Sequence, residues 1–250
     1  MDRGGPVATV TLCRPHVLNA QTPATWERLR EIGRELPGDV RIVVVRGEGR
    51  AFSAGLDLAA VRGDAGGGQP TFQRIAEADT AVAEQIIAGY QEAFGWLRRP
   101  DLITVAAVQG HAIGAGFQLA LACDLRVLTD DAQFTMAEVT LGLVPDLGGT
   151  KRLVDLVGYA RALEICATGR RVPAAEAQVL GLANQVVAGA EELDAAVNDL
   201  VARVLAAPRD AVIEIKALLA AAGGRGYPAQ EAAERAAQVR RIRDLAGLGE

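Results

Sequence analysis

Two glycine-rich segments and one glutamate carry the residue types that could do chemistry in this chain. The first segment, AFSAGLDL, runs from Ala51 to Leu58, and the second, GHAIGAGFQ, runs from Gly110 to Gln118. Glycine lets a ligand approach backbone N–H groups closely, and two N–H groups aimed at one point can stabilise a developing oxyanion. Downstream lies Glu138, whose carboxylate could move a proton beside such donors. The combination predicts an oxyanion-stabilising site with a general acid–base.

Each of these features also has a purely structural interpretation. The glycines could serve only tight strand-to-helix turns, and Glu138 could be a surface residue at the end of a strand. The neighbours of Glu138 are the apolar Met136, Ala137 and Val139. Such surroundings favour the functional interpretation, because they would raise the pKa of the carboxyl group into a range useful for catalysis.

Apolar periodicity predicts the elements that must position these segments. Short apolar or β-branched runs indicate strands over residues 7–12, 40–45, 102–108, 125–128, 133–135 and 185–187. Helical patterns cover residues 22–36, 72–99 and 115–122, and most of the chain after Gly149, with interruptions near 169–173, at Pro208 and around 223–228. Residues 63–70 read as a mobile surface loop. We therefore expect α/β architecture with largely parallel strands over residues 1–190, and a helical region over 191–250.

Composition excludes several classes of function. With 250 residues, half of them hydrophobic, the chain can bury a full core. A formal net charge of -5 argues against a nucleic-acid surface. The three cysteines are odd in number and far apart, and only His16 and His111 are histidines, so we expect reduced thiols in a cytoplasmic protein and no bound metal. No signal peptide is evident, and no apolar run reaches membrane-spanning length.

Four segments occur in an order that is typical of one family. They are Arg14–Ala20 (RPHVLNA), Ala51–Leu58, Gly110–Asp124 and Phe134–Arg152. Together they resemble the crotonase superfamily, also called the enoyl-CoA hydratase/isomerase family, over roughly residues 5 to 245. The resemblance implies a crotonase-like spiral of ββα units with a C-terminal helical trimerisation region, assembled as a homotrimer or hexamer. It also implies acyl-CoA thioester substrates and no separate cofactor, because coenzyme A is part of the substrate.

By motif position, the resemblance assigns the oxyanion-hole N–H groups to Leu56 and Ala115. The same positions, with Ala54, Asp57 and Leu58, are expected to bind the substrate. Ala115 is predicted to open a helix, whose dipole would help its N–H group to favour negative charge. Polarisation of a thioester carbonyl by these groups would make proton loss at the α-carbon possible near neutral pH.

The candidate catalytic residues depart from the hydratase pattern at one position. Hydratases of the family typically use two glutamates, which match Gln118 and Glu138 here. A glutamine can hydrogen-bond a water or an acyl oxygen but cannot shuttle a proton. We therefore expect Glu138 to transfer the proton, with double-bond isomerisation slightly favoured over hydration. The alternative is a catalytically reduced acyl-CoA-binding protein that keeps the thioester cradle.

Asp146 is a third candidate catalytic residue, in the turn Val144–Gly149 near the acyl-pocket position of the family. Alternatively, Asp146 caps the helix that begins near Gly149. The acyl pocket is expected to be lined partly by residues 63–88. The sequence ends at Glu250, short of the basic final helix that many relatives place against the CoA phosphates. Three arginines could substitute for it or could simply face solvent: Arg240, Arg241 and Arg243.

Overall fold

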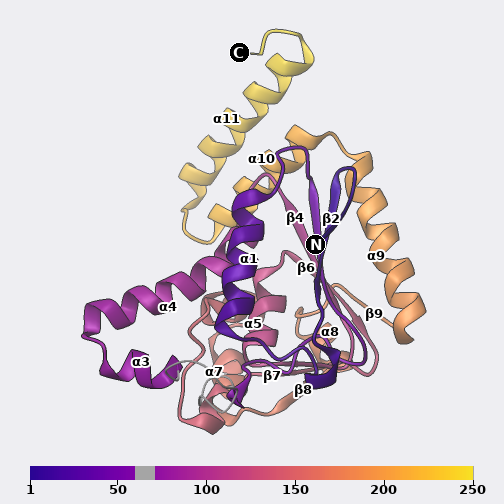
Figure 1. Ribbon diagram of the computed structural model, residues 1–250. Helices are drawn as coiled ribbons and strands as arrows, with labels where there is room; N and C mark the ends of the chain where they lie inside the picture. Colours follow the sequence, from indigo (N-terminus) through magenta and orange to yellow (C-terminus); the bar gives the residue numbers. More distant parts are fainter. Residues whose placement is uncertain (60–70, 250) are drawn as a thin grey trace.

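The computed structural model describes residues 1–59 and 71–249 (Figure 1). The predicted loop at 63–70 lies outside the described residues, as does part of the 63–88 region expected to line the acyl pocket. The strands are β1 (Asp2–Gly4), β2 (Val7–Leu12), β3 (Ile42–Gly47), β4 (Ile103–Val108), β5 (His111–Ile113), β6 (Leu125–Thr129), β7 (Gln133–Thr135), β8 (Arg171–Pro173) and β9 (Gln185–Val187).

The helices alternate with these strands until residue 187 and then continue alone. The α-helices are α1 (Pro23–Glu35), α3 (Thr71–Glu77), α4 (Thr80–Gly95), α5 (Ala115–Ala122), α6 (Gly149–Val157), α7 (Tyr159–Thr168), α8 (Ala174–Val179), α9 (Gly189–Ala206), α10 (Arg209–Ala222) and α11 (Tyr227–Leu245). Short 3-10 helices are η1 (Pro15–Val17), η2 (Trp96–Arg98) and η3 (Glu138–Leu141). No helix among the described residues is both long and apolar enough to cross a membrane.

The described strands form two sheets. In the larger sheet the order is β1-β2-β3-β4-β6-β9, and all of these pairings are parallel except that of β1 with β2. The smaller sheet has the order β5-β7-β8. The predicted α/β architecture with largely parallel strands is therefore confirmed.

Helices cover the large sheet on both faces, which explains why β3 and β4 are buried runs of β-branched residues. On one face, α1, α4 and α5 contribute to the main hydrophobic core. On the other face, α9 packs Leu193 and Val197 against Val44 and Val105 of the sheet. The α5 helix, apolar on all sides, is completely buried, as its composition predicts.

The parallel register brings the two glycine-rich segments together. Val45 of β3 pairs with Ala106 of β4, so both strands end at the same edge of the sheet. Beyond that edge Ser53 and Ala112 form an isolated parallel bridge. In it the Ser53 N–H donates to the His111 carbonyl at 2.9 Å, and the Ile113 N–H donates to the Ser53 carbonyl at 2.9 Å. Loops far apart in the sequence thus form one joint wall.

Three predicted elements differ from the observed ones. The prediction of a single helix over 72–99 is wrong, because this stretch is divided into α3, α4 and η2. Asp79 has an extended conformation and acts as the N-cap of α4, where its side chain accepts a hydrogen bond from the Val82 N–H. The strand expected at 40–45 is shifted to Ile42–Gly47. The second glycine-rich segment, expected as a loop, contains strand β5.

The C-terminal helices are joined to the core through a buried ion pair. Lys216 of α10 donates to the Leu102 carbonyl at 2.6 Å and to Asp124 Oδ2 at 2.7 Å. The last helix, α11, packs on α10 and extends away from the sheets (Figure 1). A separate helical region beginning at residue 191 stays a prediction.

Candidate active site

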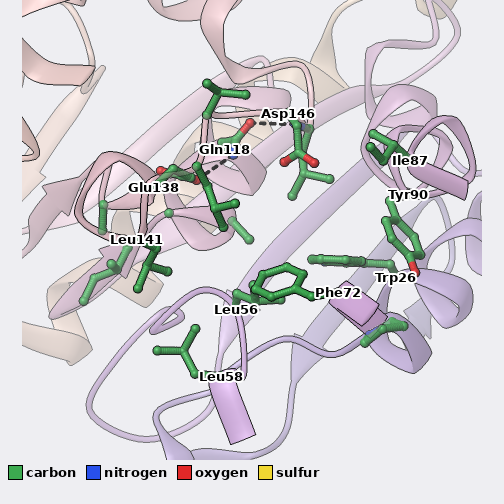
Figure 2. Close-up of a pocket in the computed structure, with 18 of the residues that line it drawn as sticks. Trp26, Leu56, Leu58, Phe72, Ile87, Tyr90, Gln118, Glu138, Leu141 and Asp146 are labelled. Carbon is green, nitrogen blue, oxygen red and sulfur yellow. Dashed lines mark hydrogen bonds between the residues drawn. The ribbon is translucent and has the colours of Figure 1, made fainter. Parts of the chain in front are cut away.

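A cavity of about 410 Å³ lies where the two glycine-rich segments meet η3 and the turn before α6 (Figure 2). Glu138 and Gln118 lie on one side of it, and Trp26 and Tyr90 lie on the other. Most of the remaining wall is apolar and comes from Leu56, Leu58, Phe72, Ile75, Ile87, Ile113, Leu141, Leu143, Val144 and Leu147. Such a cavity fits an apolar ligand with a few convergent polar contacts.

Two glycines allow the cavity walls to approach each other. Gly55 has a φ of 83°, and a Cβ there would meet the Ile113 carbonyl oxygen at 2.3 Å. Gly114 has a φ of 50°, and a Cβ there would lie 3.2 Å from Glu138 Oε1. Any side chain at Gly55 would therefore separate the segments, and one at Gly114 would crowd the carboxylate.

The N–H groups of Leu56 and Ala115 are available at this junction. Ala115 is the first residue of α5, so its N–H has no acceptor within the helix. Leu56 lies in the bridge with Gln21, but the bridge uses the flanking Gly55 carbonyl and Asp57 N–H instead. Both residues line the cavity. Two backbone donors beside one helix N-terminus, without an acceptor among residues 1–59 and 71–249, can stabilise a developing negative charge.

The two carboxylate oxygens of Glu138 have different surroundings. Gln118 Nε2 donates to Glu138 Oε1 at 2.7 Å. Glu138 Oε2 is buried and has no hydrogen-bond partner among the described residues. Burial raises the pKa of this carboxyl group, hydrogen bonds from the backbone and from Gln118 oppose that rise, and the nearby charge of Asp146 adds to it. A carboxylate in such a setting can accept and return a proton near neutral pH.

Gln118 is itself fixed by the backbone of the turn before α6. Its side chain is 1% exposed, and its Oε1 accepts hydrogen bonds from the N–H groups of Leu147 at 2.9 Å and Gly149 at 3.2 Å. A Cβ on Gly149 would meet Gln118 Cγ at 2.7 Å. Because the two backbone groups can only donate, they determine that the amide NH₂ faces Glu138. The backbone of the turn thus fixes the Gln118 side chain, and Gln118 in turn orients the carboxylate of Glu138.

Asp146 faces the cavity and does not cap α6. The N-cap residue of that helix is Gly148, with no side-chain capping bond, so the capping interpretation is wrong. The Asp146 carbonyl accepts a hydrogen bond from Gln91 Nε2 at 2.7 Å, and its carboxylate points into the cavity (Figure 2). Burial raises the pKa of this carboxyl group. The cavity therefore contains two carboxyl groups whose charge is disfavoured.

The other predicted site residues divide into those inside and outside the cavity. Ala54, Leu56, Leu58 and Ala115 line it, whereas Asp57 does not. Asp57 forms an ion pair with Arg14 at 2.9 Å, and its role as a substrate contact stays a prediction.

Two of the arginines considered for CoA phosphates already have acidic partners. Arg240 donates to both carboxylate oxygens of Glu214, and Arg241 pairs with Asp210 and Asp244. A phosphate-binding role for these side chains stays a prediction. The described residues contain no group of three or more His, Cys, Asp or Glu side chains suited to hold a metal ion.

Sequence reasoning missed the aromatic wall of the cavity. Trp26, from α1, packs against Tyr90 of α4 with ring centroids 4.7 Å apart. The periodic apolar positions of α1 predict that Trp26 is buried, but they do not tell whether it contacts the core or a ligand. Gln21 and Ser53, both fully buried and polar, were also missed. A glutamine just before a helix start carries no signal that distinguishes it from a surface residue.

The raised pKa of Glu138 predicts that the carboxylate reduces stability. A group whose folded-state pKa is raised favours the folded state below its unfolded pKa, about 4.3, and loses that contribution as the pH rises through the folded pKa. Glu138→Gln removes this titration and can still accept the bond from Gln118. We expect the melting temperature of the variant, relative to wild type, to increase from about pH 4 to about pH 8. A difference that stays constant with pH in thermal melts would contradict the shift.

The chain is similar to known proteins in both sequence and fold. The family model described as enoyl-CoA hydratase/isomerase matches residues 2–244. A putative enoyl-CoA hydratase from Thermobifida fusca YX, crystallised in complex with CoA, is 51% identical with a TM-score of 0.92, over 98% of this chain and 93% of that chain. The same relative was crystallised with acetoacetyl-CoA.

Curated relatives are more distant. A probable enoyl-CoA hydratase of Mycobacterium tuberculosis is 33% identical over 189 residues, which are 75% of this chain and 67% of that protein. The mitochondrial enoyl-CoA hydratase domain-containing protein 2 of Homo sapiens is 37% identical over 198 residues, which are 78% of this chain and 62% of that protein. The match thus spans roughly two thirds of the length of these curated relatives.

Proposed function

Because the chain belongs to the enoyl-CoA hydratase/isomerase family and is an enzyme of that family, we propose that it binds an enoyl-CoA thioester in the cavity and moves the double bond with Glu138. The observation that carries the proposal is the Gln118–Glu138 hydrogen bond in a cavity that Leu56 and Ala115 also line. The Thermobifida fusca relative, crystallised with CoA and with acetoacetyl-CoA, supports the choice of ligand. The resemblance of the motifs to this family is confirmed by the matches.

In the proposed reaction, the thioester carbonyl oxygen accepts hydrogen bonds from the Leu56 and Ala115 N–H groups. These donors stabilise the enolate that forms when a proton leaves the α-carbon, C2. Glu138 Oε2, which has no partner among the described residues, takes that proton. Return of the proton to C4 converts a 3-enoyl thioester into the 2-enoyl isomer.

Gln118 is the reason to favour isomerisation over hydration. Hydration needs one group to activate water and another to exchange the α-proton, whereas isomerisation needs one group that takes a proton and returns it nearby. The Gln118 amide cannot ionise, and its oxygen already accepts from Leu147 and Gly149. Asp146 is the other acid among the described residues that line the cavity, and it stays a candidate for returning the proton to C4 in place of Glu138.

A panel of 2-enoyl-CoA and 3-enoyl-CoA esters, followed by chromatography and mass spectrometry, tests the proposed function. We expect a change in retention time without a change in mass, which indicates isomerisation. A gain of one water would show hydration instead. Binding without any product would indicate a catalytically reduced acyl-CoA-binding protein.

We also propose that residues 191–250 serve assembly as a homotrimer or a dimer of trimers. The large apolar side chains of α10 and α11 include Ile215, Leu219, Ile242 and Leu245, each more than half exposed. Exposed apolar patches on helices are normally covered by a partner, and symmetric copies are the commonest partners. Light scattering at micromolar concentration is expected to give the mass of three or six chains. A stable monomer would contradict this proposal.

A further inference from the structure

Gln21 lies at the centre of a buried polar network between the two halves of the site. The side chain of Gln21 is fully buried. Its Oε1 accepts a hydrogen bond from Trp26 Nε1 at 2.8 Å, and its Nε2 donates to Ser53 Oγ at 3.0 Å. An indole N–H can only donate, so the Trp26 bond determines the orientation of the amide. The amide oxygen therefore bonds to Trp26 in the cavity wall, and the amide nitrogen bonds to Ser53 in the first glycine-rich segment.

Ser53 continues the network to the loop that carries the Leu56 N–H. Ser53 Oγ donates to the Asn19 carbonyl at 2.8 Å and accepts the Gly55 N–H at 3.2 Å. Together with the bond from Gln21, these contacts use the one donor and both acceptor positions of the hydroxyl. The loop is thus held at the residue directly before Leu56.

The backbone of Gln21 holds the same loop from the other side. The Gln21 N–H donates to the Gly55 carbonyl at 2.6 Å, and the Asp57 N–H donates to the Gln21 carbonyl at 2.8 Å. These two bonds flank Leu56, and neither of them uses the Leu56 N–H. One residue therefore fixes the oxyanion donor through its backbone and the acyl wall through its side chain.

Asn19, whose carbonyl accepts the bond from Ser53, is itself held in place by hydrogen bonds. Asn19 adopts a φ of 56°, and its side chain accepts the Arg14 N–H and donates to the carbonyls of Glu48 and Ala51, all at 2.8 to 2.9 Å. Fully satisfied buried polar networks restrict a site to one geometry. A displacement of Trp26 would therefore be transmitted to the Leu56 loop instead of being absorbed by a mobile side chain.

We propose that Gln21 is a positioning residue that couples the acyl-chain wall at Trp26 to the oxyanion donor at Leu56, an inference that rests on the proposed function. Trp26 and Leu56 both face the cavity (Figure 2). An acyl chain long enough to contact Trp26 would therefore press, through Gln21, on the loop that carries the Leu56 N–H. Binding energy from the distal chain then aligns the donor with the thioester oxygen and increases kcat as well as affinity. Chains too short to contact Trp26 lack this gain.

The test compares Gln21→Leu with wild type on 3-enoyl-CoA esters of increasing chain length. Leucine has a similar volume but none of the hydrogen bonds. We expect kcat to fall roughly tenfold for long chains, since small errors in alignment are costly, while KM stays within about twofold. The increase of kcat with chain length should disappear. With acetoacetyl-CoA as a probe, the near-ultraviolet absorbance of the bound enolate should weaken.

Gln109→Leu is the matched control. The Gln109 side chain likewise makes two hydrogen bonds, donating to the carbonyls of Gly47 and Gly49 at 2.7 and 2.9 Å, but it does not line the cavity. The Gln109→Leu protein should be less stable than wild type, with the same kcat and the same absorbance of the bound enolate. If Gln21→Leu fails to fold, Trp26→Phe keeps a smaller aromatic side chain in the cavity wall and removes the N–H donor to Gln21. This variant should reduce the gain of kcat with chain length.

The outcomes separate the inference from the proposed function. A folded Gln21→Leu protein, or a Trp26→Phe protein, with the kcat and chain-length dependence of wild type overturns the inference alone. A wild-type protein that neither turns over enoyl-CoA esters nor binds acetoacetyl-CoA overturns the proposed function and this inference together.

Discussion

Replacement of Glu138 by glutamine is expected to lower turnover by roughly two orders of magnitude or more, the usual scale for loss of a general acid–base. The variant should keep the fold and the binding of CoA esters. The reason lies in the geometry: a glutamine oxygen can still accept the bond that Gln118 Nε2 donates at 2.7 Å, but an amide cannot take a proton at the buried position of Oε2. The measurement is kcat and KM on the best 3-enoyl-CoA ester, together with a thioester-binding titration.

Asp146→Asn is the paired variant for this prediction. Both carboxyl groups line the cavity, and burial raises the pKa of each. If Glu138 both takes and returns the proton, the loss of activity in Asp146→Asn should be much smaller. A Glu138→Gln protein that keeps most of its activity would assign the proton transfer to Asp146 or to no side chain at all.

Replacement of Gln118 by glutamate is expected to create or raise water addition to a 2-enoyl-CoA. One oxygen of the new carboxylate would keep the bonds from Leu147 and Gly149, and the other would face Glu138 Oε1, which now lies 2.7 Å from Gln118 Nε2. Two carboxyl groups at such a short distance share one proton, so the pKa of one is raised and that of the other is lowered. The ionised member could then activate water while the protonated one supplies the α-proton.

This variant must be tested for stability beside activity, because position 118 is buried. The raised pKa of the pair gives a stability contribution that is present at low pH and is lost as the pH rises through that pKa. Melting curves at low and high pH therefore accompany the assay for water addition by mass. Gln118→Met, which removes the amide without adding an acid, should show no gain in hydration. A well-folded Gln118→Glu protein without hydration would show that cavity shape, and not this amide, determines the reaction.

The sequence predicts the core of the fold well where burial is continuous. The β-branched run in β3 and α5, which is apolar except at Gln118, have few alternatives, so their types are right, and α5 has the predicted bounds. The division between α3 and α4 was missed because the apolar pattern continues across Asp79, whose capping role is a local hydrogen bond. Strand β5 was missed because three residues in a glycine-rich segment show no periodicity, and its partner, β7, lies elsewhere in the chain.

The site was predicted only in part for a similar reason. Motif positions identify Glu138, Gln118, Leu56 and Ala115 through the resemblance, and the structure places all of them at one cavity. The link from Gln21 to Ser53 joins residues 32 positions apart. Such a contact depends on how η1, α1 and the first glycine-rich segment pack together, and no spacing within one segment encodes it.

The central claim is that Glu138 takes a proton from C2 and returns it to C4. It can be tested by following that proton. A 3-enoyl-CoA with both C2 hydrogens replaced by deuterium is converted in a single turnover in ordinary water, and the product is analysed by mass and by NMR. We expect a 2-enoyl-CoA of unchanged mass with one deuterium at C4, because the same carboxyl group carries the deuteron between the two carbons. A product that has gained water, or a 2-enoyl-CoA whose newly gained C4 hydrogen is protium from the solvent, would contradict the claim.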